Sequence, residues 1–289
     1  ALSIGYLLDR NDNEFTFIGR DEIQLDELLK KGTNSHYSTC KFKNKPKIQL
    51  LNGTFNYDII FYCLPSSCLN IVQNLKNVII VFTCKGFYDD FIYNKFENYC
   101  ILAGGSYAIE IFKNIPCYMT LSSLKKENNI IINKLINSKY CIISNNNQPK
   151  SIELLGIFKN ILAIFCGIIN ELNMGKNIEA AFISIVLKNI KDIMELDERT
   201  LIEPSGIGDL FLSCSSIKSR NYSFGISLIQ NKTDKFDKLV EGYQSLYNMK
   251  KYKNNNIINN LSNIIEVILE RESNENIKDK ILKIIFPHH

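Results

Sequence analysis

The hydrophobic pattern of the chain changes near residue 150. Before that point, short apolar runs alternate with helical stretches, which is the pattern of parallel strands covered by crossover helices. The runs at 59–63 and 78–82 are continuously apolar instead of alternating, as strands buried on both faces require. Beyond that point, apolar residues recur at helical spacing and the strand-like runs stop. The pattern therefore predicts two different kinds of domain.

The predicted elements follow from this change of period. Strands are predicted at 15–18, 57–63, 78–82, 99–103, 118–121 and 140–143, with helices such as 21–31 and 125–137 between them. Later helices are predicted at 152–172, 178–196, 208–213, 222–230, 238–252, 256–270 and 276–285. We expect a Rossmann-like, doubly wound α/β domain over 1–147 that binds a dinucleotide, and an all-α substrate domain over 148–289.

The composition agrees with a globular protein of two domains. The chain has 289 residues, of which 45% are hydrophobic and 22% charged. Its net charge of +4 is small and both signs are mixed along the chain, which argues against a nucleic-acid partner. A signal peptide and an uncharged apolar run of about 18 residues are not evident, so we expect a cytoplasmic protein without membrane insertion.

The cysteines and histidines exclude several kinds of site. The nine cysteines are odd in number, show no Cys-x-x-Cys spacing and sit mostly in apolar runs, which predicts free thiols in a reducing compartment. Of the three histidines, His288 and His289 end the chain and only His36 is internal. One internal histidine is too few for a zinc site or a Ser-His-Asp triad, and no metal is predicted.

Polar residues follow several predicted strands, where an open α/β sheet places its ligand crevice. Arg20 stands where such a fold selects between a ribose hydroxyl and a 2′-phosphate, so it permits NADP, although an exposed turn arginine explains it as well. Lys85 could attract a phosphate, or be a surface lysine before a turn. The amide of Gly104 beside Ser106 could receive an anion, although an ordinary strand-to-helix turn has the same composition.

The helical half carries its own polar residues. Lys159 interrupts an apolar helix, where loss of water would lower its pKa and let it accept a proton near neutral pH; alternatively its long side chain extends to the surface. Asp209 could hold that ammonium group or be an ordinary acid in a first helical turn. Arg220 and Asn221 suit a phosphate held at two points, or an ordinary polar surface.

The stretch at 206–225 is the most specific motif. It reads Gly-Ile-Gly-Asp-Leu-Phe-Leu-Ser-Cys-Ser-Ser-Ile-Lys-Ser-Arg-Asn-Tyr-Ser-Phe-Gly. It resembles the Gly-Leu-Gly-Asp-Leu…Thr-Cys…Ser-Arg-Asn…Phe-Gly signature of the bacterial NAD(P)-dependent glycerol-3-phosphate dehydrogenases. Lys159-Asn160, Thr-Cys-Lys-Gly at 83–86 and Val-Glu-Gly at 240–242 are similar to further motifs of that family, so the resemblance extends over essentially the whole chain.

The resemblance implies a reaction and a role for each residue. The reaction interconverts sn-glycerol 3-phosphate and dihydroxyacetone phosphate by hydride transfer with NAD or NADP, for glycerophospholipid synthesis. Lys159 would exchange the proton at the C2 oxygen, with Lys85 beside it and Asp209 orienting both lysines. The implied substrate contacts are Lys85, Gly104, Ser106, Asp209, Ser219, Arg220 and Asn221. The implied cofactor contacts are Arg20, Lys85, Ala108, Arg220, Leu239 and Glu241. The implied partner is a small phosphorylated substrate, and a homodimer is left open.

Two departures from the family pattern matter. The family's first strand and Gly-x-Gly-x-x-Gly loop would precede Ala1, and residues 1–8 already have a helical pattern, so we expect the true start upstream and a weak cofactor affinity without it. Gly105 replaces a proline of the family's substrate loop.

Two alternative functions remain. One is another 6-phosphogluconate-dehydrogenase-like reductase of hydroxy acids or ketones, and the other is a degenerate, non-catalytic relative.

Overall fold

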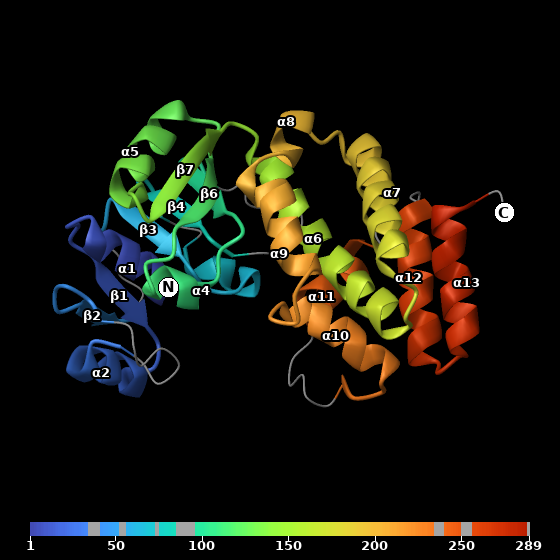
Figure 1. The fold of residues 1–289 in the computed structure, drawn as a ribbon. Coiled ribbons are helices and arrows are strands. Elements are labelled where there is room, and N and C mark those ends of the chain that lie inside the picture. Colours follow the sequence, from blue (N-terminus) through green and yellow to red (C-terminus); the bar gives the residue numbers. More distant parts are fainter. Residues whose placement is uncertain are drawn as a thin grey trace. The chain divides into compact units, whose positions relative to one another are not determined.

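The protein divides into two compact units. The computed structural model describes residues 1–33, 41–51, 56–72, 75–84, 96–233, 240–249 and 256–287. The described residues up to Lys150 form one unit, which we call the sheet unit, and those from Ser151 onward form the helical unit (Figure 1). The predicted fold class, a Rossmann-like α/β part followed by an all-α part, is confirmed.

The strands of the sheet unit form two separate sheets. The strands are β1 Thr16–Gly19, β2 Lys47–Leu50, β3 Ile59–Tyr62, β4 Ile79–Phe82, β5 Tyr99–Ala103, β6 Cys117–Ser122 and β7 Cys141–Asn146. One sheet pairs β1 with β2, and the other has the order β3-β4-β5-β6-β7. Every pair is parallel except β5 with β6, which is antiparallel. The prediction of parallel strands throughout is therefore wrong for one pair.

The helices of the sheet unit cover these strands. They are α1 Leu2–Arg10, α2 Glu22–Lys31, the 3-10 helix η2 Ser66–Ile71, α4 Ala108–Phe112 and α5 Lys126–Ile136. Helix α1 packs against α4 and α5, because its buried apolar side chains, such as Ile4, Leu7 and Leu8, join the core of the larger sheet. The buried Asp9 carboxylate accepts hydrogen bonds from the backbone N–H groups of Lys43 and Asn44. This anchors the chain ahead of β2.

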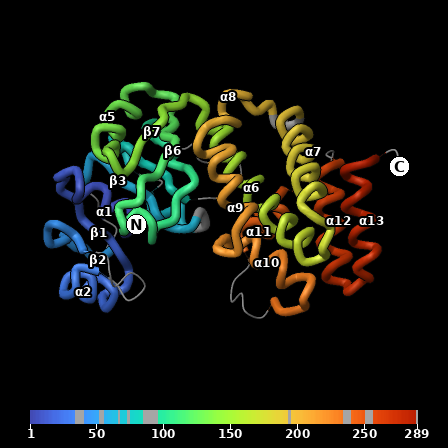
Figure 2. Tube along the Cα trace, in the orientation of Figure 1, coloured from blue at the N-terminus to red at the C-terminus, as the bar shows by residue number. Residues whose placement is uncertain are grey.

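The helical unit consists of helices around one long central element. They are α6 Pro149–Glu171, α7 Lys176–Met194, α8 Glu198–Leu201, the π-helical turn η3 Pro204–Gly208, α9 Asp209–Cys214, α10 Arg220–Ile229, α11 Glu241–Met249, α12 Asn256–Leu269 and α13 Asn274–Ile285. Helices α7, α12 and α13 lie side by side (Figure 2). Their apolar faces pack with α6 into a single hydrophobic core.

Helix α6 is the central element of the helical unit. Of the helices in the described part of the chain, it alone is long and apolar enough to cross a membrane by length and composition. However, 89% of its most apolar window is buried inside the protein. A helix that is apolar all round is what the core of a helical domain requires. Burial of α6 in the core of the helical unit therefore explains why this helix is so apolar.

Candidate functional site in the helical unit

A buried lysine is the first feature of the site. Lys159 lies on α6 with only 3% of its surface exposed. Its Nζ is 2.5 Å from Oδ1 of Asp209 and donates a hydrogen bond of 3.1 Å to Oγ of Ser213. Desolvation disfavours a charged amine, whereas an adjacent carboxylate favours it. The carboxylate therefore compensates for burial of the ammonium group, and we call these three residues the lysine cluster.

The turn before α9 positions Asp209, the acidic partner of Lys159. The π-helical turn η3 ends at Gly208, and Asp209 begins α9 directly after it. A side chain at Gly206 would put its Cβ 2.3 Å from the carbonyl oxygen of Leu201, so only glycine allows this close approach. Ser213 is one helical turn after Asp209 and therefore lies on the same face of α9. One short helix therefore supplies both Asp209 and Ser213 to the lysine.

A second group of polar residues meets at the next position of α6. Asn160 is buried, and its Nδ2 donates to Oε2 of Glu241 at 3.3 Å. Oδ1 of Asn221 accepts a 3.0 Å hydrogen bond from the backbone N–H of Gly242. A Cβ at Gly242 would lie 2.5 Å from the carbonyl oxygen of Asn160, so glycine is required here as well. We call Asn160, Asn221, Glu241 and Gly242 the amide cluster.

Close helix packing fixes the position of the Arg220-Asn221 pair. Helices α6 and α10 cross with glycines facing the opposite backbone. A Cβ at Gly225 would lie 2.0 Å from the carbonyl oxygen of Ile164, and one at Gly167 would lie 2.1 Å from that of Tyr222. Helix α10 begins at Arg220, and its N-cap residue Ser219 accepts a hydrogen bond from the N–H of Tyr222.

The Arg220 side chain is exposed, while Asn221 is buried. The Asn221 oxygen is engaged by Gly242, so the donor side of this amide is oriented by the fold. An exposed guanidinium and an oriented amide are thus adjacent at the start of α10. This combination can bind a phosphate at two points.

The helical unit brings together most of the residues predicted there. Lys159 with Asp209, and Asn221 with the segment containing Glu241, are in contact within this unit. Leu239 and Lys85 lie outside the described residues. Ser213, Asn160 and Gly242 were given no role by the sequence analysis. The spacing of four residues between Asp209 and Ser213 on one helix was the signal that could have found the serine.

The remaining predicted residues belong to the sheet unit. Arg20 is exposed directly after β1, and Ser106 and Ala108 are half-buried beyond the end of β5. Gly104 has a φ of +155°. A Cβ there would lie 2.9 Å from Cα of Met119 on the neighbouring strand β6, so packing within the sheet already requires this glycine.

Comparison with solved structures confirms the fold. A crystal structure described as glycerol-3-phosphate dehydrogenase from Coxiella burnetii matches with a TM-score of 0.84 and 20% sequence identity. The match covers 98% of this chain and 94% of the other. At this identity the match establishes the fold alone, a Rossmann-like domain followed by an all-α domain.

Sequence comparison identifies the family. Residues 148–278 match the family model described as the C-terminus of NAD-dependent glycerol-3-phosphate dehydrogenase. The glycerol-3-phosphate dehydrogenase [NAD(P)+] of Mycoplasma mobile is 31% identical over 95% of this chain and 90% of its own length. That of Neorickettsia sennetsu is 25% identical over 94% of this chain and 87% of its own length. The chain belongs to the NAD(P)+-dependent glycerol-3-phosphate dehydrogenase family, as the sequence motifs indicated.

Proposed function

We propose that this chain interconverts sn-glycerol 3-phosphate and dihydroxyacetone phosphate with a nicotinamide cofactor. The observation that carries the proposal is the lysine cluster, in which a buried ammonium group is held by Asp209 and Ser213. Such a group can stabilise negative charge that develops on a carbonyl oxygen and then supply the proton. Membership of the family supports the same reaction.

Lys159 is the proposed proton donor and acceptor at the C2 oxygen. When the ketone is reduced, C2 gains a hydride, the C–O double bond becomes single, and the oxygen takes a proton from the Lys159 ammonium. In the reverse direction the hydroxyl returns that proton to the neutral amine. The short contact with Asp209 stabilises the ammonium form, which is the form that reduction of dihydroxyacetone phosphate requires. Lys85 is proposed to act beside it.

The start of α10 is the proposed binding site for the substrate phosphate. Arg220 offers parallel N–H donors, and the amide of Asn221 is oriented by its bond to Gly242. Ser219 precedes them as the helix cap, and the positive end of the helix adds to the attraction for an anion. Gly104 and Ser106 are proposed as further substrate contacts, on the family resemblance alone.

The sheet unit is the proposed cofactor domain. A bound nicotinamide would supply the hydride acceptor or donor. At the end of β1, Oδ1 of Asp21 accepts hydrogen bonds from the N–H groups of Ile23 and Gln24, at 3.0 and 3.1 Å. This carboxylate oxygen therefore caps α2, while the exposed Arg20 beside it can contact a 2′-phosphate, which supports NADP. Lys85, Ala108, Arg220, Leu239 and Glu241 complete the proposed cofactor contacts.

The two domains are proposed to have separate roles. Residues 1–147 are assigned to cofactor binding and 148–289 to the substrate and the proton transfer, in agreement with the position of the lysine cluster.

Because sn-glycerol 3-phosphate is a precursor of glycerophospholipids, we assign the enzyme to their synthesis in the cytoplasm. The proposed assembly is a homodimer without a nucleic-acid or membrane partner.

Steady-state oxidation of NADH and NADPH tests the proposed reaction. The substrates are dihydroxyacetone phosphate, unphosphorylated dihydroxyacetone and a panel of 2-keto acids. We expect turnover with dihydroxyacetone phosphate, a value of kcat/KM at least about 100-fold lower without the phosphate, and a loss of this preference in Arg220→Ala. A preference for a 2-keto acid would instead support a reductase of the wider structural group. Binding of dihydroxyacetone phosphate without any turnover would favour a non-catalytic relative.

A further inference from the structure

Two cysteines lie opposite each other at the start of neighbouring strands in the sheet unit. Cys117 begins β6 and Cys141 begins β7, and the two are register partners in this parallel pair. Adjacent strands of a sheet lie about 4.8 Å apart. That spacing falls within the range of about 4.4–6.8 Å that separates the Cα atoms of a disulfide. The backbone therefore holds the two residues at a separation that a disulfide can span.

The two side chains point to the same face of the sheet. Side chains alternate along a strand, and the next register pair, Tyr118 and Ile142, is 51% and 52% exposed on the opposite face. Cys141 is fully buried in the hydrophobic core of the sheet unit, and Cys117 packs against that core while remaining half-buried. The Cys141 thiol donates a hydrogen bond to the Cys117 sulfur. The two sulfur atoms are therefore already in contact.

The two thiols differ in acidity and in access to solvent. The hydrogen bond from Cys141 lowers the pKa of the Cys117 thiol, although burial opposes this effect. The same hydrogen bond and burial raise the pKa of the Cys141 thiol. The thiolate is the form of cysteine that attacks an oxidant, and it must also be accessible. Cys117 is the more acidic and the more exposed of the two, so it is the attacking residue.

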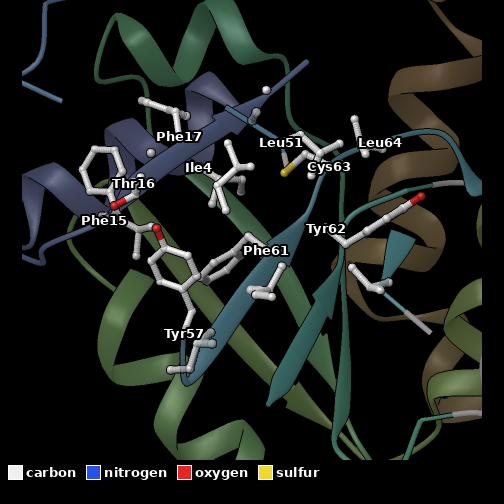
Figure 3. A pocket seen from close by; sticks show the side chains of 18 of the residues that line it. Ile4, Phe15, Thr16, Phe17, Leu51, Tyr57, Phe61, Tyr62, Cys63 and Leu64 are labelled. Carbon is white, nitrogen blue, oxygen red and sulfur yellow. The ribbon is translucent and has the colours of Figure 1, made fainter. Parts of the chain in front are cut away.

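Two other positions show only one of these features. Cys166 and Cys214 also share a hydrogen bond, but they are buried, with 0% and 3% of their surface exposed. Cys63 is half-buried and lines an apolar cavity of about 470 Å³ with Leu51 (Figure 3). It is the one cysteine among the described residues that line this cavity. Access to solvent and contact with a second thiol are combined at Cys117.

We propose that Cys117 and Cys141 are a site of reversible oxidation, at which a hydroperoxide converts the two thiols of the folded chain into a disulfide. The Cys117 sulfur attacks one peroxide oxygen, the O–O bond breaks, and the sulfur becomes a sulfenic acid while the other oxygen leaves with the thiol proton. Cys141 then attacks that sulfur, the S–S bond forms, and the S–O bond breaks to release water with the second proton. Two electrons pass from the thiols to the peroxide.

The disulfide has a physical consequence for the sheet unit. It joins the starts of β6 and β7 and so closes the segment that contains α5, whose buried Ile132 and Ile136 belong to the same core. A covalent link of this kind restricts the unfolded chain and thereby stabilises the fold. The site therefore makes the sheet unit more resistant to unfolding under oxidising conditions. This inference does not rest on the proposed function, because it concerns the thiol pair alone.

Peptide mapping of the full chain after treatment with hydrogen peroxide tests the proposal. Remaining thiols are alkylated before the digestion, so that disulfides cannot exchange. Trypsin places the two cysteines on separate peptides, 114–125 and 140–150, each with a single cysteine. We expect these peptides to be joined under non-reducing conditions and separate after treatment with dithiothreitol. The peptides that contain Cys166 and Cys214 are the matched control, and they should stay unlinked because both thiols are buried.

Two variants identify the order of the steps. In Cys141→Ala the sulfenic acid of Cys117 has no thiol beside it, so dimedone should label Cys117 at least about tenfold more than in the unchanged chain. In Cys117→Ser, dimedone should not label Cys141. Labelling of Cys141 instead would overturn the assignment of Cys117 as the attacking residue. Thermal unfolding of the oxidised chain should show a higher midpoint than that of the reduced chain, and the peroxide-treated Cys117→Ser variant should lack this increase.

The mapping of the unchanged chain decides the proposal even if a variant fails to fold. Absence of the link between 114–125 and 140–150, while other thiols of the chain are oxidised, would overturn it. Equal linkage of Cys166 with Cys214 would also overturn it, because oxidation would then follow unfolding. A link that forms between two chains, and therefore depends on protein concentration, would contradict a disulfide within one chain.

Discussion

At the scale of single residues, the site depends on how a buried charge is compensated. Lys159 and Asp209 have 3% and 6% of their side-chain surface exposed, so neither charge is solvated by bulk water. The hydrogen bond to Ser213 satisfies a further donor of the ammonium group. A buried pair of this kind contributes little net stability relative to apolar residues of similar size, but it is costly to break. A buried ion pair between α6 and α9 therefore points to a role in catalysis.

Breaking the pair from one side should destabilise the protein strongly. We expect Asp209→Ala to lower the free energy of unfolding by about 3–5 kcal/mol, because it leaves the Lys159 ammonium without its counter-ion. Replacement of both, as Lys159→Met with Asp209→Leu, should recover most of that loss while remaining inactive. Urea denaturation of the single and double variants measures the coupling. Strictly additive losses would show that the two side chains do not stabilise each other.

At the scale of elements, the crossing of α6 and α10 holds the proposed phosphate site in place. Gly225→Ala would place a methyl group 2.0 Å from the Ile164 carbonyl oxygen, so α10 must shift. We expect a loss of stability and an increase in KM for dihydroxyacetone phosphate, because Arg220 and Asn221 begin that helix.

The matched control is Gly156→Ala on α6. A Cβ at Gly156 meets nothing within 4 Å, so the substitution should raise stability by about 1 kcal/mol through helix propensity. Thermal unfolding and steady-state kinetics of the two variants provide the comparison. An unchanged KM in Gly225→Ala would show that the position of α10 does not determine substrate affinity.

The elements were predicted best where burial is complete. Strand β5 matches its predicted range of 99–103, and β4 differs by one residue, because both are continuously apolar and enclosed. Strand β2 was missed, since Lys47–Leu50 is a short strand with alternating polar residues. The antiparallel direction of β6 could not be predicted either, because burial on both faces has the same hydrophobic pattern in either direction.

The lysine cluster and the sheet unit differed in how far they could be predicted. The lysine cluster draws two of its three residues from one short motif, so local spacing was enough to identify Asp209, and helical periodicity placed Lys159. The half-burial of Ile59, Ile60 and Phe61 in β3 could not be predicted from the apolar run at 59–63, which indicated a strand enclosed on both faces. Whether an edge strand is paired depends on contacts distant in sequence, which periodicity does not report.

At the scale of the whole molecule, buried thiols make the fold sensitive to alkaline pH. Burial raises the pKa of the Cys100 thiol from 9.0 to about 12, and a hydrogen bond with Cys214 together with burial raises that of Cys166. The unfolded chain therefore loses these protons at a lower pH than the folded one. Their contribution to stability is complete below about pH 9 and declines as the pH rises toward the folded-state values.

The decline should be about 1.4 kcal/mol per pH unit for each such thiol above about pH 9. Cys100→Val removes one thiol from the core and should flatten the slope by that amount. Urea unfolding between neutral pH and about pH 10 measures it. An identical slope in the variant would show that Cys100 does not remain protonated in the folded state.

The proposed reaction depends on Lys159 as the residue that exchanges a proton with the substrate. The most direct measurement is kcat for the reduction of dihydroxyacetone phosphate by Lys159→Met, with Lys188→Met, an exposed lysine on α7, as control. We predict a fall in kcat of about 10²–10⁴-fold in the first variant and none in the second, with the first still folded. Undiminished turnover in a folded Lys159→Met protein would contradict the account.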